Sequence, residues 1–164
     1  RNPDTLVLDT GLGRPAVDSY QSYFRDPRAG IIGRSNVDDR LYVKELVIGV
    51  FGHSSHKAYG YRHLIDDPLI HGTFEYRPIL VTFNEDGGAV SVFDRTVNGQ
   101  ALTFARTDDP LLMSDAESGS TWTVDTGEAV GGSLNGTRLD RVSFTTSFWF
   151  GWADFYPDTE VYTP

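Results

Sequence analysis

The stretch that decides the fold is Arg77-Pro-Ile-Leu-Val-Thr-Phe-Asn-Glu-Asp-Gly-Gly-Ala-Val-Ser-Val-Phe-Asp-Arg95. Its residues 79–83 form an unbroken run of β-branched, aliphatic and aromatic side chains. Residues 84–88 are typical of a turn, and residues 89–93 alternate small or polar with apolar side chains. Two such runs around a Gly-rich turn predict a β-hairpin, and the unbroken apolar run predicts that its first strand is buried on both faces.

Short strand-like runs separated by frequent turns surround this hairpin. We expect short helices at residues 62–68 and 148–155, the second with Ser147 as its N-cap residue. Further strands are expected at residues 40–51, 57–61, 100–106, 120–125, 138–144 and 161–163. This pattern predicts a mainly β fold, in which residues 17–164 form a single compact barrel-like or sandwich-like domain with one short C-terminal helix.

Residues 1–16 are expected to form an extended N-terminal arm. They contain the strand-like run Thr5, Leu6, Val7 and Leu8, which Gly and Pro residues follow. Two interpretations of this run stay open. Either it adds to a sheet edge of another subunit, or it is an edge strand of its own domain.

Composition and charge exclude several classes of protein. The chain has 164 residues, the length of one domain, and its formal net charge is −9, which disfavours binding to nucleic-acid phosphates. No apolar run is long enough to cross a bilayer, so we expect no membrane span. There is no cysteine, which excludes disulfides and thiolate ligands.

The charged residues are unevenly distributed among their types. The chain has two lysines against twelve arginines, and seventeen of its acidic residues are aspartates. Such an acidic, Lys-poor composition is typical of proteins of a halophilic archaeon, and an ordinary acidic secreted protein is the alternative.

Two features favour a location outside the cell. The chain begins with Arg1 rather than Met, from which we expect a mature exported protein whose leader has been removed. Asn135-Gly-Thr137 is a glycosylation sequon on a Gly-rich segment, so Asn135 is a candidate N-glycan site. We therefore expect an extracellular or cell-surface protein.

The order of short motifs along the chain resembles that of the DUF3179 family, a group of largely uncharacterised, often exported bacterial and archaeal proteins. The resemblance covers roughly residues 40–163. Besides the segment at residues 77–83, it rests on Leu46-Val-Ile-Gly-Val50, Lys57-Ala-Tyr59, Phe93-Asp-Arg95, Leu102-Thr-Phe104, Ser118-Gly-Ser-Thr-Trp122, Thr126-Gly-Glu-Ala129, Gly136-Thr-Arg-Leu139 and the run from Trp152 through Tyr156-Pro-Asp-Thr-Glu-Val161.

The resemblance implies a site that this chain carries only in part. The family pattern has two cysteines at the tip of the central hairpin, a histidine upstream and a methionine further on, a set that suits a soft metal such as copper. Here the cysteine positions hold Asn84 and Gly87, the histidine position falls near Asp67, and Met113 alone is in its place. The resemblance therefore implies a scaffold without the family's ligand set.

Aromatic side chains are concentrated towards the C-terminus. Exposed rings would bind sugars, and buried rings would serve packing in the core or at an interface. The concentration consists of Trp122, Trp149, Trp152, Phe148, Phe150, Phe155 and Tyr156.

Two hypotheses about function follow. The first is an exported, non-catalytic structural protein without a cofactor, whose partners are copies of itself and whose arm pairs with a neighbouring subunit's sheet in a filament or layer. The alternative is a monomeric exported metal-binding or redox protein with the substituted ligands Asp67, His71, Asn84 and Met113.

Overall fold

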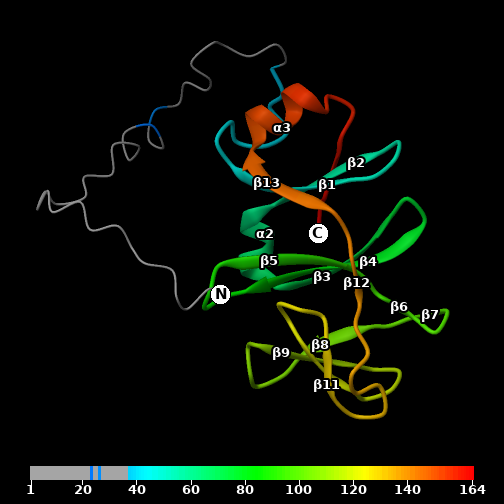
Figure 1. Ribbon diagram of the computed structural model, residues 1–164. Helices are drawn as coiled ribbons and strands as arrows, with labels where there is room; N and C mark the ends of the chain where they lie inside the picture. Colours follow the sequence, from blue (N-terminus) through cyan, green and yellow to red (C-terminus); the bar gives the residue numbers. More distant parts are fainter. Residues whose placement is uncertain (1–22, 24–25, 27–36) are drawn as a thin grey trace, which may run out of the picture.

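The computed structural model describes residues 23, 26 and 37–164 (Figure 1). The predicted arm at residues 1–16, with Thr5, Leu6, Val7 and Leu8, lies outside the described residues. Within them the fold is mainly β with a short C-terminal helix, as predicted from the sequence. No helix in this part of the chain is long and apolar enough to cross a membrane.

In the part of the chain that the structure describes, the strands form three four-stranded sheets and one two-stranded hairpin. The first sheet has the order β13 (Phe144–Phe148), β1 (Leu46–Phe51), β2 (His56–Gly60) and β14 (Glu160–Val161). The central sheet has the order β12 (Asp140–Arg141), β5 (Ala89–Asp94), β4 (Arg77–Asn84) and β3 (Leu69–Phe74). The third sheet has the order β11 (Ala129–Gly131), β10 (Thr121–Thr123), β9 (Leu112–Asp115) and β8 (Phe104–Arg106), and β6 (Thr96–Val97) pairs with β7 (Gln100–Ala101).

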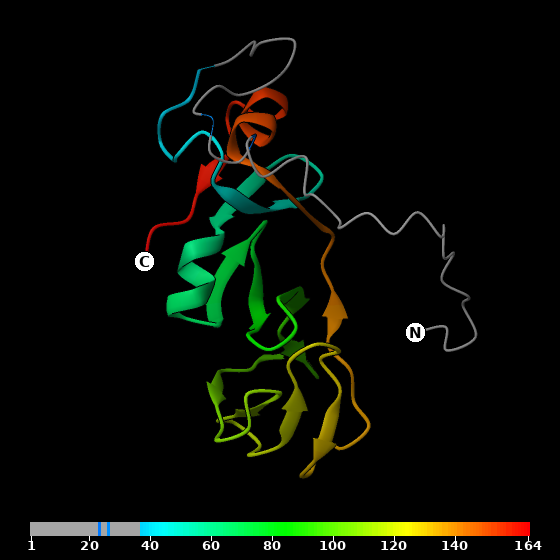
Figure 2. The ribbon, with the colours of Figure 1, turned by 90° about the vertical axis from the view of Figure 1, so that its left-hand side faces the viewer.

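These sheets are arranged as layers. From top to bottom, Figure 1 shows helix α3 (Trp149–Phe155), the first sheet, the central sheet and the third sheet. The view in Figure 2 shows the same order, with helix α2 (Tyr61–Asp66) at the side of the central sheet. Apolar faces of neighbouring layers pack against each other, and within the described residues this gives three hydrophobic cores.

Strand β4 lies between two of these cores. Every residue from 79 to 84 is buried, which confirms the burial predicted for this strand. Ile79, Val81 and Phe83 face the first core, which the first and central sheets share, while Leu80 faces the second core, towards the third sheet. β4 pairs with β5 from Ile79 to Asn84, as expected for the central hairpin.

Four local predictions were wrong. The strand expected at residues 138–144 is divided between β12 in the central sheet and β13 in the first sheet. The strand expected from residue 40 begins only at Leu46. The strand expected at residues 100–106 is divided, because Asn98, with a positive φ of 52°, helps to close the separate β6–β7 hairpin and β8 joins another sheet. Ser147 lies in β13 and is not an N-cap, since Phe148 occupies the cap position of α3 and makes no side-chain cap hydrogen bond.

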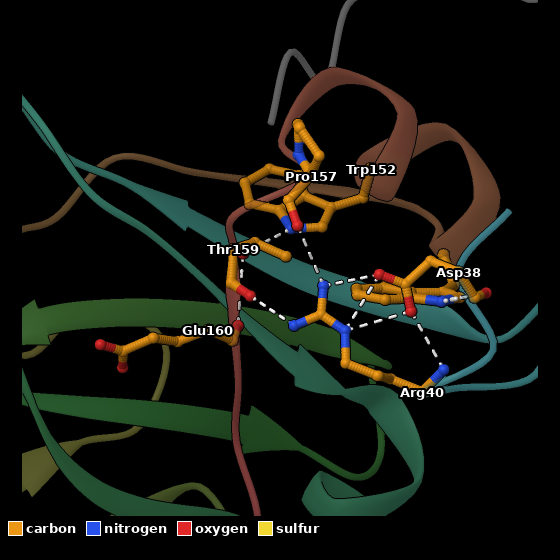
Figure 3. Close-up of polar contacts among 7 residues, drawn as sticks. Asp38, Arg40, Trp152, Pro157, Thr159 and Glu160 are labelled. Atoms are coloured by element: carbon orange, nitrogen blue, oxygen red, sulfur yellow. Dashed lines mark hydrogen bonds and ion pairs between the residues drawn. The ribbon is translucent and has the colours of Figure 1, made fainter. Parts of the chain in front are cut away.

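Arg40 joins the start of the described domain to its C-terminal segment (Figure 3). Its guanidinium donates to the Asp38 carboxylate at 2.6 Å, to the Thr159 carbonyl at 2.7 Å and to the Pro157 carbonyl at 3.3 Å. The hydrogen bond from Arg40 holds the pKa of Asp38 below its ordinary value. Trp149 donates its indole N–H to the Asp38 carbonyl at 3.1 Å, so α3 is part of the same arrangement.

Helix α3 covers the outer face of the first sheet through Trp152. The Trp152 ring lies directly over Gly49 in β1, so that a Cβ atom at residue 49 would overlap the ring. Trp152 also donates its indole N–H to Thr159 Oγ1 at 3.0 Å, which fixes the orientation of the ring. The absence of a side chain at residue 49 is therefore a requirement of helix packing.

We predict that Gly49→Ala lowers the free energy of unfolding by about 1–3 kcal/mol, because the new methyl group displaces Trp152. Gly151→Ala is the matched control. Residue 151 is helical and has no neighbouring atom near its Cβ position, so alanine there should leave stability unchanged or raise it by about 0.5–1 kcal/mol. Urea unfolding of the two variants measures both effects, and equal stabilities would contradict the packing argument.

Candidate functional site

The end of the central hairpin is the candidate site, since the resemblance places a metal there. On the face of β4 and β5 that is turned towards the third sheet, three polar side chains bind the segment that follows β10. Thr82 Oγ1 donates to the Val124 carbonyl at 2.9 Å, and Ser91 Oγ donates to the Asp125 carbonyl at 2.9 Å. Asn84 Nδ2 donates to both carboxylate oxygens of Asp125, at 3.1 and 2.9 Å.

Asn84 also closes the turn of its own hairpin. Its Oδ1 accepts the backbone N–H groups of Asp86 and Gly87, both at 3.1 Å. The side chain is buried, yet both its donor and its acceptor have partners. The residues at the two positions of the family's cysteines, Asn84 and Gly87, are thus joined by a hydrogen bond. In this chain the Asn84 side chain closes the turn through its oxygen and binds Asp125 through its nitrogen.

The other proposed metal ligands have structural partners as well. His71 Nε2 accepts the backbone N–H of Phe104 at 2.9 Å and so links the central sheet to the third sheet. Asp67 Oδ1 accepts the Leu69 N–H at 3.2 Å. Met113 is fully buried in the second core. Each of the three side chains therefore has a role in the scaffold.

The surroundings of the hairpin end leave little room for a ligand. The cavity beside it, lined by Phe83, Glu85 and Arg106 among others, has a volume of about 10 Å³. That volume holds about one water, whereas small-molecule sites measure about 300–1,000 Å³. Residues 37–164 contain no group of three or more His, Asp or Glu side chains placed to hold a metal ion.

A second polar network lies in the third sheet and was not foreseen from the sequence. Asp115 is buried, and its carboxylate accepts the Trp122 indole N–H at 2.8 Å and the Ser118 hydroxyl at 2.7 Å. Burial raises the pKa of Asp115, but these hydrogen bonds and those from the Ser118 and Ser120 backbones outweigh it and hold the pKa below its ordinary value. The motif at residues 118–122 is therefore a structural turn around a carboxylate.

Of the aromatic concentration, Trp122 and Trp149 are fully buried, and Trp152 is nearly so. Trp152 nevertheless lines an open groove between α3 and β13, with Phe155 and Tyr156. This groove has a volume of about 330 Å³, and the Phe155 side chain is 83% exposed. The aromatic concentration therefore contributes both to core packing and to an exposed apolar surface.

The remaining site residue, Asn135, is exposed in the turn that follows β11. Its backbone N–H donates to the Gly132 carbonyl at 3.3 Å, within the turn at residues 133–136. An exposed turn is the environment in which a sequon can be glycosylated.

We predict that Asn84→Ala lowers the free energy of unfolding by about 1–3 kcal/mol, because the N–H groups of Asp86 and Gly87 lose their acceptor and each such hydrogen bond contributes about 0.5–1.5 kcal/mol. Asn84→Asp should cost at least as much near neutral pH, since it sets two carboxylates against each other. Asp86→Ala is the control, because that exposed side chain has no contact in the turn comparable with that of Asn84. Urea unfolding near pH 7 gives the three values, and an Asn84→Ala variant as stable as the control would contradict this role.

We also predict a pH dependence of stability from His71. Burial, followed by the charge of Arg95, lowers the pKa of His71, so the folded state favours the neutral ring that accepts the Phe104 N–H. The contribution to stability is complete above the unfolded pKa of about 6.5 and is lost as pH falls through the folded pKa. Unfolding measured from about pH 7 to about pH 5 should show this loss, and His71→Gln should reduce the slope because its amide oxygen accepts without titrating. The exposed His53 provides the control variant His53→Gln, and an identical slope in both variants would refute the assignment.

Comparison with family models gives a match over most of the chain. The family model described as "Protein of unknown function (DUF3179)" matches residues 1–159 of the 164 residues. The searches of curated proteins and of solved structures found no match. The matched range includes N-terminal residues that lie outside the resemblance over residues 40–163. Since the match covers nearly the whole chain, this protein belongs to the DUF3179 family.

Proposed function

We propose that this DUF3179 protein is an exported, non-catalytic structural subunit that assembles with copies of itself. In the assembly, residues 5–8 of one copy add as a strand to the first sheet of the next copy, at the edge of β13. The observation that carries the proposal is the open edge of β13 beside an exposed aromatic groove.

β13 has the properties of an acceptor edge. It pairs with β1 along five residue positions, and within residues 37–164 no strand pairs with its other side. Thr145 and Thr146 in its middle are exposed. At such an edge, an added strand gains affinity from main-chain hydrogen bonds and specificity from its alternate side chains.

The other sheet edges are less suited to this role. β14 has two residues, and the ion pair between Lys57 and Glu160, at 3.3 Å, places charges beside it. β3 is longer, but the third sheet approaches it through the His71–Phe104 hydrogen bond. β11 has three residues. β13 therefore combines length, exposure and an adjoining apolar surface.

The candidate metal ligands support the structural interpretation over the alternative. Asn84, His71 and Asp67 each donate or accept hydrogen bonds within the scaffold, and a metal would have to displace these bonds. The exposed Asn135 suits a surface glycan, which fits a protein outside the cell. The charge of −9 makes copies repel one another, so assembly at high salt, where repulsion is screened, is part of the proposal.

The test is deletion of residues 1–13. We predict that the full chain forms regular polymers at molar salt, seen by electron microscopy and by sedimentation, and that the deleted chain sediments as a folded monomer, because the donor strand is missing. Leu6→Asp with Leu8→Asp should act like the deletion, whereas Asp4→Asn with Asp9→Asn is the matched control and should still assemble. Polymers formed by the deleted chain would show that the arm is not the connector.

A further inference from the structure

We infer that the groove between β13 and α3 is the receptor for Leu6 and Leu8 of a neighbouring copy. This inference rests on the proposed function and adds to it the contact surface and the direction in which the arm's side chains face. The groove lies on the α3 side of the first sheet, whereas the hairpin end lies in the central sheet.

The register of the first sheet shows which side chains meet the groove. Val47 pairs with Ser147, and Gly49 pairs with Thr145. Val47 belongs to the third core beneath α3, and Gly49 lies under Trp152. Thr145 and Ser147 therefore point to the α3 side, where they form the floor of the groove.

The wall of the groove is apolar, and ring contacts hold two of its three aromatic side chains, Trp152 and Tyr156, in position. Trp152, Phe155 and Tyr156 provide it, and Gly151 leaves it open, because this glycine has no side chain. The Tyr156 ring lies 4.0 Å from the His56 ring and 4.4 Å from the Trp152 ring, measured between centroids. A wall held in place by such ring contacts loses little conformational freedom when it binds a partner.

A strand added beside β13 would place alternate side chains over this wall. In the run of residues 5–8, Leu6 and Leu8 share one face and Thr5 and Val7 share the other. Only the Leu6 and Leu8 face offers two large aliphatic side chains to an aromatic surface. The groove volume of about 330 Å³ is at the lower end of the range for sites that enclose small molecules.

The path of the chain makes the contact reachable. The Tyr23 ring lies 6.4 Å from the ring of Phe148, the last residue of β13, and Lys44 Nζ donates to the Tyr23 carbonyl while lying 3.7 Å from its ring centre. The chain thus passes the end of β13 at Tyr23. Leu8 lies 15 residues before it, a reach of at most about 50 Å, enough for an adjoining subunit.

The test uses the absence of cysteine from the chain, so that each introduced thiol is unique. Chains carrying Leu8→Cys are mixed with chains carrying Phe155→Cys, allowed to assemble and oxidised gently. We expect a disulfide-linked pair made of one chain of each kind. Thr5→Cys with Phe155→Cys, and Leu8→Cys with Tyr76→Cys, are controls, because Thr5 is on the other strand face and Tyr76 is a fully exposed turn residue away from the groove.

The outcomes separate this inference from the proposed function. Normal polymers without the Leu8–Phe155 link would overturn the groove assignment and leave assembly through the arm in place. A link formed inside a single chain carrying both substitutions, in a monomeric fraction, would overturn the neighbour as occupant. Failure of the unmodified chain to assemble would overturn the proposed function, and the inference with it.

A substitution in the groove gives an independent readout. Phe155→Asp should raise the subunit concentration needed for assembly roughly tenfold or more, because an exposed aromatic contact is replaced by a charge. Ile65→Asp on α2 is the matched control, an exposed apolar residue outside the groove, and should leave that concentration unchanged. Equal effects of both substitutions would overturn the assignment.

Discussion

The burial of β4 on both faces is the constraint on which the rest of the structure depends. A strand that carries Ile79, Val81 and Phe83 on one side and Leu80 on the other needs an apolar cover for each face. The first sheet provides one cover and the third sheet provides the other, so the layered order of the molecule follows from this single strand. On the face towards the third sheet, β4 also carries the polar residues Thr82 and Asn84. They donate hydrogen bonds to the carbonyl of Val124 and the carboxylate of Asp125 in the covering segment.

Local pattern was sufficient to predict the hairpin and the mainly β class, whereas the family was inferred from the resemblance in the order of the motifs. Runs of apolar residues and Gly-rich turns act over a few positions, and the structure of residues 77–94 follows them. The contacts of the candidate site are different in kind. Asn84 meets Asp125 across 41 residues, and His71 meets Phe104 across 33 residues. No periodicity in either segment signals its partner, because the pairing depends on how the sheets stack.

The shared family motifs acquire a physical meaning in the scaffold. Gly49, in the first motif, makes room for Trp152, and the motif that ends at Trp122 folds around the buried carboxylate of Asp115. Both motifs therefore have a packing role in this chain. At the hairpin end the Asn84 amide also has a structural role, because it donates to the Asp125 carboxylate and accepts an N–H of the turn.

The Arg40 contacts have a mechanical consequence. If copies are joined by their arms as proposed, a pulling force would enter each subunit at β13 and leave it through the segment that precedes β1. Arg40 and Asp38 lie at that exit, and they are fastened to the C-terminal segment and, through Trp149, to the helix next to β13. Tension would therefore run along one side of the subunit, through the first sheet and α3, where hydrogen bonds resist it together. The central and third sheets would carry no load, so a fibre could be stretched without strain on the hairpin end.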